Sequence, residues 1–268
     1  MTIIDGVSGS GVVVTGAGAG IGRALARGLA AAGARVVIND LDPDAAAAAA
    51  EQTGGYAVPG DASTEQGVRD LIAAARGHLG SIDIYCSNAG IAVGTGPDTP
   101  EETWQRAWDV NVMAHVRASR ELLPAWLERG YGCFVVTASA AGLLTMLGSA
   151  PYSVTKHGAE SYAEWLAATY AHRGLTVHCI CPQGVKTHML AESGQAGQVV
   201  LADAAIEPEQ VADALLAGMA AGSFLILPHP QVRDYYQMRA GDTGKWLRGM
   251  NRMQQRIEEV ERAGEDHR

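Results

Sequence analysis

The feature that most constrains the fold is a glycine-rich stretch near the N-terminus, residues 12–22, with the sequence VVVTGAGAGIG. It predicts a short apolar strand, a turn and the start of a helix, because the following residues 23–32 are rich in alanine and leucine. Gly16, Gly20 and Gly22 permit a tight turn, close approach of the backbone to a phosphate, and close packing of helix on strand. The N-terminus of such a helix presents free N–H groups and the positive end of its dipole, so it is suited to bind a pyrophosphate.

A second predicted strand, Arg35 to Asn39, follows this helix and ends in Asp40. Asp40 stands 20 residues after Gly20, where a dinucleotide site uses a carboxylate to bind the ribose hydroxyls of the adenosine. The alternative is a flexible surface loop with a chance acidic residue. The order of strand, glycine turn, helix and strand favours the dinucleotide site.

Composition excludes several classes of protein. The chain has 268 residues, of which 47% are hydrophobic and 18% charged, so it can bury a sizeable core, and we expect one domain over residues 1–268. The net charge of −9 argues against nucleic acid and against anionic membranes as partners. Neither an N-terminal signal pattern nor an apolar run of 18 residues is present, so we expect a soluble, cytoplasmic protein.

Cysteine and histidine usage indicates neither disulfides nor a metal. The four cysteines lie in apolar, strand-like runs without a Cys-x-x-Cys pair, and we expect buried, reduced thiols. The eight histidines lack the spacing of metal ligands, so the sequence predicts no structural metal.

Apolar strand runs alternate with helical stretches along the chain, which predicts parallel strands joined by crossover helices. The predicted strands cover residues 12–15, 35–39, 55–59, 82–86, 132–138, 175–181 and 224–227. The predicted helices after the first cover residues 42–52, 65–79, 101–129, 151–172 and 208–220, with a less regular segment over 183–206. The expected fold is therefore a doubly wound α/β domain, with a seven-stranded parallel sheet and helices on both faces.

The tail over residues 231–268 differs from the rest of the chain. It is charged, and Trp246, Met250, Met253, Ile257 and Val260 recur at alternating spacings of four and three, which predicts one apolar stripe on a helix. Packing against the body of the fold or against a partner subunit is the first interpretation. The second is a lid over the substrate.

The strongest chemical signal is the pair Tyr152 and Lys156. The two residues lie four apart on a predicted helix and share one face. A tyrosine with an ordinary pKa of about 10 is a poor base near neutrality, and a nearby ammonium is expected to lower that pKa. The pair can then exchange a proton with an alcohol or a carbonyl. Ser139 precedes Tyr152 by 13 residues at the C-terminal end of the fifth predicted strand, the edge where open α/β sheets bind ligands.

At this point the sequence resembles the short-chain dehydrogenase/reductase family over nearly its whole length. Thr15, Gly16, Gly20, Ile21 and Gly22 match the family's cofactor motif, and residues 88–90 (Asn88, Ala89 and Gly90) match the motif after its fourth strand. The family's catalytic tetrad is matched, in the same order and spacing, by Asn111, Ser139, Tyr152 and Lys156.

The resemblance implies a role for each of these residues. Tyr152 would exchange the proton while a hydride passes between the substrate carbon and the nicotinamide. Lys156 would tune Tyr152 and hold the nicotinamide ribose, and Ser139 would hydrogen-bond the substrate oxygen. Asn111 would hold a water that connects Lys156 to solvent. Homodimers or homotetramers formed through the long helices 101–129 and 151–172 and the last strand are also implied.

The implied cofactor contacts extend along the chain. Asp61 matches the adenine-contacting aspartate of the family, although a role in capping the next helix is an open alternative. Residues 182–187 resemble the loop that binds the nicotinamide amide, usually Pro-Gly-x-Val-x-Thr, but here Gln183 follows the proline. The full set of predicted cofactor contacts is Gly16, Gly18, Ala19, Gly20, Ile21, Gly22, Asp40, Leu41, Asp61, Ala62, Asn88, Ala89, Gly90, Tyr152, Lys156, Pro182, Gly184, Val185 and Thr187.

The charge around Asp40 predicts NAD rather than NADP as the cofactor. A 2′-phosphate next to Asp40 would be repelled. Relatives that prefer NADP place Arg or Lys where this chain has Ala19 and Leu41.

The predicted substrate pocket is apolar and contains few charges. Its expected lining is Ala92, Val93, Ala140, Leu143, Leu144, Met146, Met189 and Leu190. No arginine is obviously placed to bind a carboxylate or phosphate, and Lys186 is read as a solvated lysine. His157 and His188 lie near the site in sequence and are interpreted as bystanders.

The sequence thus predicts an NAD-dependent oxidoreductase that interconverts a small apolar secondary alcohol and its ketone. An epimerase or dehydratase relative is one rival, although extended relatives of that kind usually have a larger C-terminal region. A binding protein that senses redox state without turnover is another, and the complete set Asn111, Ser139, Tyr152 and Lys156 argues against it. Substrate identity, physiological direction, stereochemistry and the choice between dimer and tetramer are not encoded in these patterns.

Overall fold

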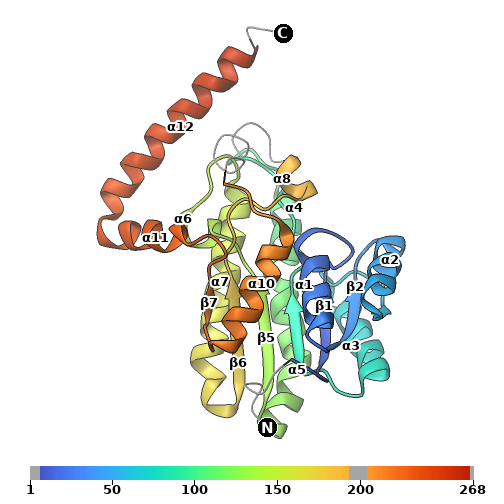
Figure 1. The fold of residues 1–268 in the computed structure, drawn as a ribbon. Helices are drawn as coiled ribbons and strands as arrows, with labels where there is room; N and C mark the ends of the chain where they lie inside the picture. Colours follow the sequence, from blue (N-terminus) through green and yellow to red (C-terminus); the bar gives the residue numbers. More distant parts are fainter. Residues whose placement is uncertain (1–6, 193–203, 266–268) are drawn as a thin grey trace.

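A seven-stranded parallel sheet forms the centre of the molecule in the computed structural model, which describes residues 7–192 and 204–265 (Figure 1). The strand order is β3-β2-β1-β4-β5-β6-β7, so the direction of winding reverses between β1 and β4. The strands are β1 Gly11–Thr15, β2 Arg35–Asn39, β3 Tyr56–Ala57, β4 Ile84–Ser87, β5 Gly132–Thr137, β6 Leu175–Ile180 and β7 Leu225–Ile226. The predicted doubly wound fold is confirmed, and the strand ends differ from the prediction by a few residues.

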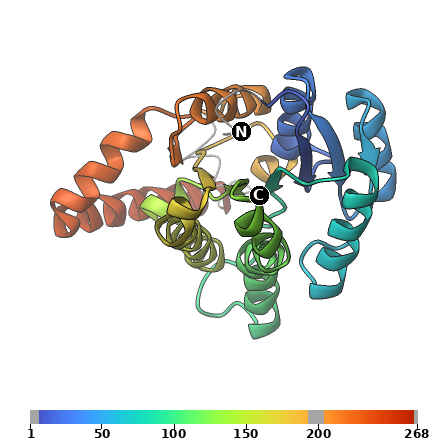
Figure 2. The same cartoon turned by 90° about the horizontal axis from the view of Figure 1, so that it is seen from below.

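Helices cover both faces of the sheet, as Figure 2 shows in the view from below. One face carries α1 Gly20–Ala31, α2 Pro43–Thr53 and α10 Pro208–Ala220. The other face carries α3 Glu65–Leu79, α5 Ala114–Arg129 and α7 Ala150–Tyr170, which is followed by a 3₁₀ turn, Ala171–Arg173. Two short helices, α6 Ala141–Leu144 and α8 His188–Ala191, lie at the carboxyl ends of the strands.

The strands separate two hydrophobic cores by simple alternation of side chains. Val12 and Val14 of β1 pack under α1 and α10, whereas Val13 packs on the opposite side with α3 and α5. Because both faces are covered, the strands read as nearly continuous apolar runs rather than alternating ones. Helix starts follow their sequence signals: Asp42 caps α2 by accepting from the backbone N–H groups of residues 44 and 45, and Thr64 caps α3.

The long helix predicted over Glu101 to Arg129 is interrupted, which corrects that prediction. It consists of α4 Glu101–Trp108, a π-helical turn over Asp109–Met113, and α5. Such turns insert one extra residue into a helix and are frequent at functional sites. Asn111 lies inside this turn and is fully buried.

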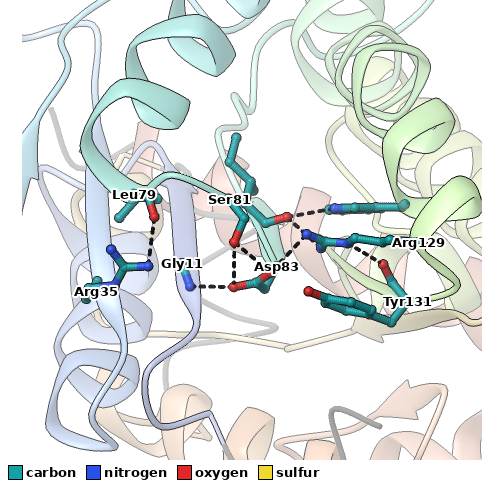
Figure 3. A network of polar contacts seen from close by, with 9 residues as sticks. Gly11, Arg35, Leu79, Ser81, Asp83, Arg129 and Tyr131 are labelled. Carbon is teal, nitrogen blue, oxygen red and sulfur yellow. Dashed lines mark hydrogen bonds and ion pairs between the residues drawn. The ribbon is translucent and has the colours of Figure 1, made fainter. Parts of the chain in front are cut away.

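A polar network fastens the amino ends of the central strands, at the edge opposite the ligand-binding edge (Figure 3). Asp83 accepts from the backbone N–H of Gly11 at 2.8 Å and forms an ion pair with Arg129 at 3.1 Å. The Arg129 guanidinium also donates to the carbonyls of Ile82 and Tyr131 and stacks on the Tyr131 ring, 3.9 Å from its centroid. The network joins β1, β4 and the end of α5, and so holds the frame on which the functional edge is built.

The tail after β7 forms two helices, α11 Gln231–Gly241 and α12 Thr243–Glu265. α11 lies beside α6 and is anchored by Val232, which is buried in the main core. α12 extends from it away from the sheet (Figure 1). None of the described helices is long and apolar enough to cross a membrane.

Candidate active site

The glycine-rich turn after β1 is locked to the end of β4 by Thr15 and Asn88. The Thr15 hydroxyl oxygen accepts from the backbone N–H groups of Asn88 and Ala89, each at 3.0 Å. The Asn88 amide in turn donates to the carbonyls of Thr15 at 3.0 Å and Gly16 at 3.3 Å. Gly16 has a positive φ of 61°, and a side chain at Gly22 would overlap the Gly16 carbonyl. The motif glycines therefore meet conformational and steric requirements that other residues cannot.

The N-terminus of α1 has the features of an anion site. Its N-cap residue, Ala19, has an extended backbone, and among the described residues no side chain caps the first N–H groups. Asp40 stands just after β2 and accepts from the Gly18 N–H at 2.8 Å. Ala19, Gly20 and Asp40 line one continuous cavity of about 1650 Å³. A single ligand pocket holds roughly 300–1,000 Å³, so this cavity has room for a dinucleotide and a second molecule.

Asp61 lies in the same cavity, at the start of the turn before α3. Its side chain accepts from the backbone N–H of Ser63 at 2.8 Å and from the Ser63 hydroxyl at 2.6 Å. Thr64, rather than Asp61, caps the helix, since its hydroxyl accepts from the Gly67 N–H. One carboxylate oxygen of Asp61 thus organises the turn, which leaves its predicted contact with adenine a proposal.

Ser139, Tyr152 and Lys156 reach the same cavity from two neighbouring elements. Ser139 follows β5, and its hydroxyl donates weakly to the Pro182 carbonyl at 3.4 Å. Tyr152 and Lys156 share one face of α7, with the lysine nitrogen 5.7 Å from the centre of the tyrosine ring. The Lys156 ammonium is buried and donates to the Thr137 carbonyl at 2.9 Å.

The pKa of Tyr152 shifts in the direction opposite to the one predicted from the sequence. Burial raises the pKa of Tyr152 above its usual value of 10.0, although a hydrogen bond with Ser139 acts in the opposite direction. Burial also lowers the pKa of Lys156 from 10.5 to about 8. Both groups lose hydration, and this loss outweighs the expected stabilisation of the phenolate by the ammonium. Tyr152 therefore keeps its hydroxyl proton at neutral pH in this structure.

Asn111 does not line the cavity but braces the loop behind it. Its carbonyl oxygen accepts from the Ile91 N–H at 2.9 Å, and its amide donates to the Ile91 carbonyl at 2.9 Å and the Thr155 hydroxyl at 3.0 Å. This explains why an asparagine stands within an apolar helical stretch. The water-holding role implied by the resemblance stays a proposal.

The loop over residues 182–187 is held by His229, which the sequence analysis did not identify. The Gln183 N–H donates to Nδ1 of His229 at 3.1 Å, and Nε2 of His229 faces the Gly184 carbonyl at 3.1 Å. These contacts fix the neutral tautomer with the proton on Nε2, and burial lowers the pKa of His229 in keeping with this. The Gln183 side chain accepts from Gln231 at the start of α11. The unusual glutamine therefore ties the loop to the C-terminal tail.

The cavity brings together most of the predicted site residues. Of the predicted cofactor contacts only Gly18 does not line it, and of the predicted catalytic residues only Asn111 does not. Val93 and Leu143 of the predicted substrate pocket are absent from the lining, and Leu143 is buried in the main core. Lys186 does not line it and forms an exposed ion pair with Glu207 at 2.6 Å. Among the described residues no cluster of histidine, cysteine and carboxylate side chains could hold a metal ion.

The C-terminal tail forms one wall of this cavity. The sequence pattern left two placements open, against the body of the fold or a partner subunit, or over the substrate. Trp246, Met250 and Met253 of the predicted stripe line the cavity, whereas Ile257 is buried and Val260 is exposed. Tyr235 and Met238 of α11 line it as well. The spacing of the stripe predicted the helix, but no local signal showed that residues 245–253 of this helix line the cavity.

Comparison with known proteins agrees with this geometry. Residues 10–198 match the family model described as short chain dehydrogenase. A 1-deoxy-11-beta-hydroxypentalenate dehydrogenase of Streptomyces avermitilis is 33% identical over 242 residues, which cover 87% of this chain and 88% of that protein. A cyclohexanol dehydrogenase of an Acinetobacter species is 34% identical over 197 residues, covering 70% of this chain and 78% of that protein. A solved short-chain dehydrogenase/reductase of Burkholderia phymatum in complex with NAD has a TM-score of 0.81, with 27% identity and coverage of 88% and 94%.

His115 generates a prediction about stability. Its ring is fully buried one turn after Asn111, with Nδ1 2.6 Å from the Ser87 hydroxyl, and Nε2 has no hydrogen-bond partner within residues 7–192 and 204–265. Burial, and secondarily the charge of Lys156, lower its pKa from 6.5 to about 3. The unfolded chain therefore binds a proton here below pH 6.5 that the folded protein does not bind until about pH 3.

Stability contributed by neutral His115 is present above pH 6.5 and is lost on acidification, by about 1.4 kcal/mol per pH unit between pH 6.5 and 3. Urea unfolding of the wild type and of His115→Gln across this range measures the effect. The variant should show a shallower loss of unfolding free energy as the pH falls. Parallel curves for the two proteins would contradict the assignment.

Proposed function

The chain belongs to the short-chain dehydrogenase family, and from this we propose that it is an NAD-dependent enzyme that interconverts an apolar secondary alcohol and its ketone. The observation that carries the proposal is the single cavity that joins the glycine turn and Asp40 to Ser139, Tyr152 and Lys156. Named dehydrogenases of a hydroxypentalenate and of cyclohexanol among the relatives support an alcohol substrate. The apolar lining from α6, α8, α11 and α12 supports an apolar one.

The residues present fit a nicotinamide dinucleotide. The uncapped N-terminus of α1 and the glycine turn suit a pyrophosphate, and Asp40 lies where ribose hydroxyls need an acceptor. Thr187 and the 182–184 loop would hold the nicotinamide end, supported by His229. When bound, NAD supplies the carbon that accepts or donates the hydride.

The side chains of this protein would handle the proton and the orientation of the substrate. The Ser139 hydroxyl would bind the substrate oxygen, and Tyr152 would donate a proton to that oxygen in ketone reduction. Its raised pKa keeps the hydroxyl protonated and ready for this direction. In alcohol oxidation Tyr152 would first lose its proton, and Lys156 beside it would stabilise the phenolate.

Incubation with NAD and a panel of alicyclic, aryl, terpenoid and steroid secondary alcohols tests the proposal, with NADH absorbance as the measurement. Tyr152→Phe should lower kcat by about a hundredfold or more, because the ring remains while the proton donor is lost. Tyr162→Phe is the matched control, since the Tyr162 hydroxyl bonds Ser119 and does not line the cavity.

If the chain were instead an NAD-binding protein without turnover, the same panel would give a different result. Silence with every alcohol and ketone, while thermal shift shows tight NAD binding, would overturn the enzyme proposal in its favour. Equal activity of wild type and Tyr152→Phe would overturn the role of Tyr152.

NAD is proposed over NADP because the Asp40 carboxylate would repel a 2′-phosphate. Asp40→Asn should raise kcat/KM with NADP relative to NAD by about tenfold, since the charge is lost while an oxygen remains to accept from the Gly18 N–H. Asp42→Asn is the control, because Asp42 caps α2 and does not line the cavity. An unchanged cofactor ratio in Asp40→Asn would contradict the assignment.

A homodimer or homotetramer through α4, α5 and α7 is proposed from exposed apolar side chains on these helices. Val154 and Trp165 of α7 are 49% and 51% exposed, and Trp108 at the end of α4 is 40% exposed. Val154 and Trp165 are eleven residues apart and lie on the same face of the helix. Burying that face against a second copy would remove apolar surface from water.

Light scattering at micromolar concentration should give a dimer or tetramer for the wild type, and Trp165→Glu should shift it to a smaller species. Leu247→Glu, on the exposed surface of α12, should leave the mass unchanged. A monomeric wild type would refute the oligomer.

A further inference from the structure

Two cationic side chains of α12, Lys245 and Arg252, line the cavity and have no role in the proposed reaction. We propose that they bind an anionic group, a carboxylate, on the substrate, at the end of an apolar body away from the reacting alcohol. This inference rests on the proposed function and names the substrate class of the same site. It also revises the expectation, from sequence, of a pocket with few charges.

Contacts of α11 and of Trp246 hold the start of α12 beside α6 and α7. Arg239 of α11 donates to the Leu143 carbonyl of α6 and contacts Nε2 of His157 on α7. Trp246 packs against the main core and lies 6.3 Å from the Tyr235 ring, between centroids. α12 therefore begins next to α6, which follows Ser139, and next to α7, which carries Tyr152 and Lys156.

Two of the other cations that line the cavity, Lys156 and Arg117, are already engaged. Lys156 donates to the Thr137 carbonyl, and Arg117 pairs with Asp109 at 2.6 Å. Arg106 follows Glu102 by one helical turn, and both line the cavity. Lys245 and Arg252 differ from Lys156 and Arg117, because neither has an ion pair with any carboxylate among the side chains that the structure describes.

The start of α12 is basic. Its first fifteen residues, 243–257, contain four cations and no aspartate or glutamate. Lys245 and Arg252 are seven residues apart, so they share one face and their backbones stand about 10 Å apart. Gly249 lies between them on that face, and from the described parts of the chain outside its own helix backbone an Arg252 nitrogen, at 3.9 Å, is the one atom within 4 Å of the position of its absent Cβ. Two cations thus flank an open recess in the wall.

Apolar side chains of α12 surround this recess. Met250, Met253 and Trp246 adjoin the two cations on the same side of α12, and all three line the cavity. An apolar body would pack on the thioether and indole side chains, which adapt to irregular shapes. Its carboxylate would lie between Lys245 and Arg252. A neutral alcohol of the same size would make no ionic contact with the two exposed cations, which would stay hydrated.

The test measures binding directly and needs neither turnover nor NAD. Calorimetry with octanoate and with its neutral analogue octanamide compares the wild type with a Lys245→Gln/Arg252→Gln double variant. Arg248→Gln/Arg256→Gln is the matched control, because these two cations belong to the same helix and do not line the cavity. Glutamine preserves helix propensity in both pairs.

The wild type and the control should bind octanoate about tenfold more tightly than the Lys245→Gln/Arg252→Gln variant does, and this advantage should shrink with added salt. All three proteins should bind octanamide equally. Where an alcohol is oxidised, octanoate should inhibit competitively against it. Equal octanoate affinity in the two double variants, or no preference of the wild type for octanoate over octanamide, would overturn the inference.

The two proposals fail separately. Absence of turnover, with the octanoate preference of the wild type intact and lost in the Lys245→Gln/Arg252→Gln variant, would reject only the proposed reaction. Ready oxidation of neutral alcohols, with octanoate binding independent of the two cations, would reject only the anion site.

Discussion

The rest of the functional edge depends on one set of hydrogen bonds, between the ends of β1 and β4. These strands are neighbours at the point where the winding of the sheet reverses, which is where open α/β sheets form a ligand crevice. The Thr15 hydroxyl accepts from two successive N–H groups after β4, and the Asn88 amide donates to the carbonyls of Thr15, the last residue of β1, and of Gly16. Four hydrogen bonds thus hold the glycine turn and the Asn88–Gly90 segment at a fixed separation, and both segments line the cavity.

The same crevice explains why distant parts of the chain act at one place. Ser139 follows β5, and its hydroxyl donates to the Pro182 carbonyl in the loop after β6. That loop is held by His229 after β7 and by Gln231 at the start of α11. Ser139, the loop over residues 182–187 and the start of α11 are therefore linked through hydrogen bonds to the backbone of a few loops. A shift of α11 would therefore displace the loop over residues 182–187, which is predicted to hold the nicotinamide.

The parts of the fold that could be predicted from sequence are those set by local rules. Buried parallel strands read as apolar runs, the glycines of the turn satisfy strict backbone and steric conditions, and Tyr152 and Lys156 share a helical face by spacing alone. The break around Asn111 could not be predicted, since a π-helical turn leaves the composition of the helix unchanged. The direction of the pKa of Tyr152 was wrong, because it depends on burial, which only the folded structure defines.

Which residues the fold brings together over long distances also could not be predicted from local sequence patterns. Val93 and Leu143 are apolar residues near the catalytic motifs, yet neither lines the cavity. Lys245 and Arg252 do line it, although they lie about a hundred residues from Tyr152 in sequence. Periodicity can assign a face to a helix, but which surface that face meets is decided by the path of the chain, here by the anchoring of α11 through Val232 and Arg239.

The central claim is that one cavity brings an alcohol carbon and a nicotinamide into direct contact. Isotope transfer tests this most directly: a secondary alcohol that the enzyme oxidises is supplied with deuterium on its carbinol carbon, and the NADH formed is analysed by NMR and mass spectrometry. The account predicts that the deuterium appears at C4 of the nicotinamide, on one face of the ring. NADH that carries no deuterium would show that the hydrogen does not pass directly between the two carbons, and would contradict the account.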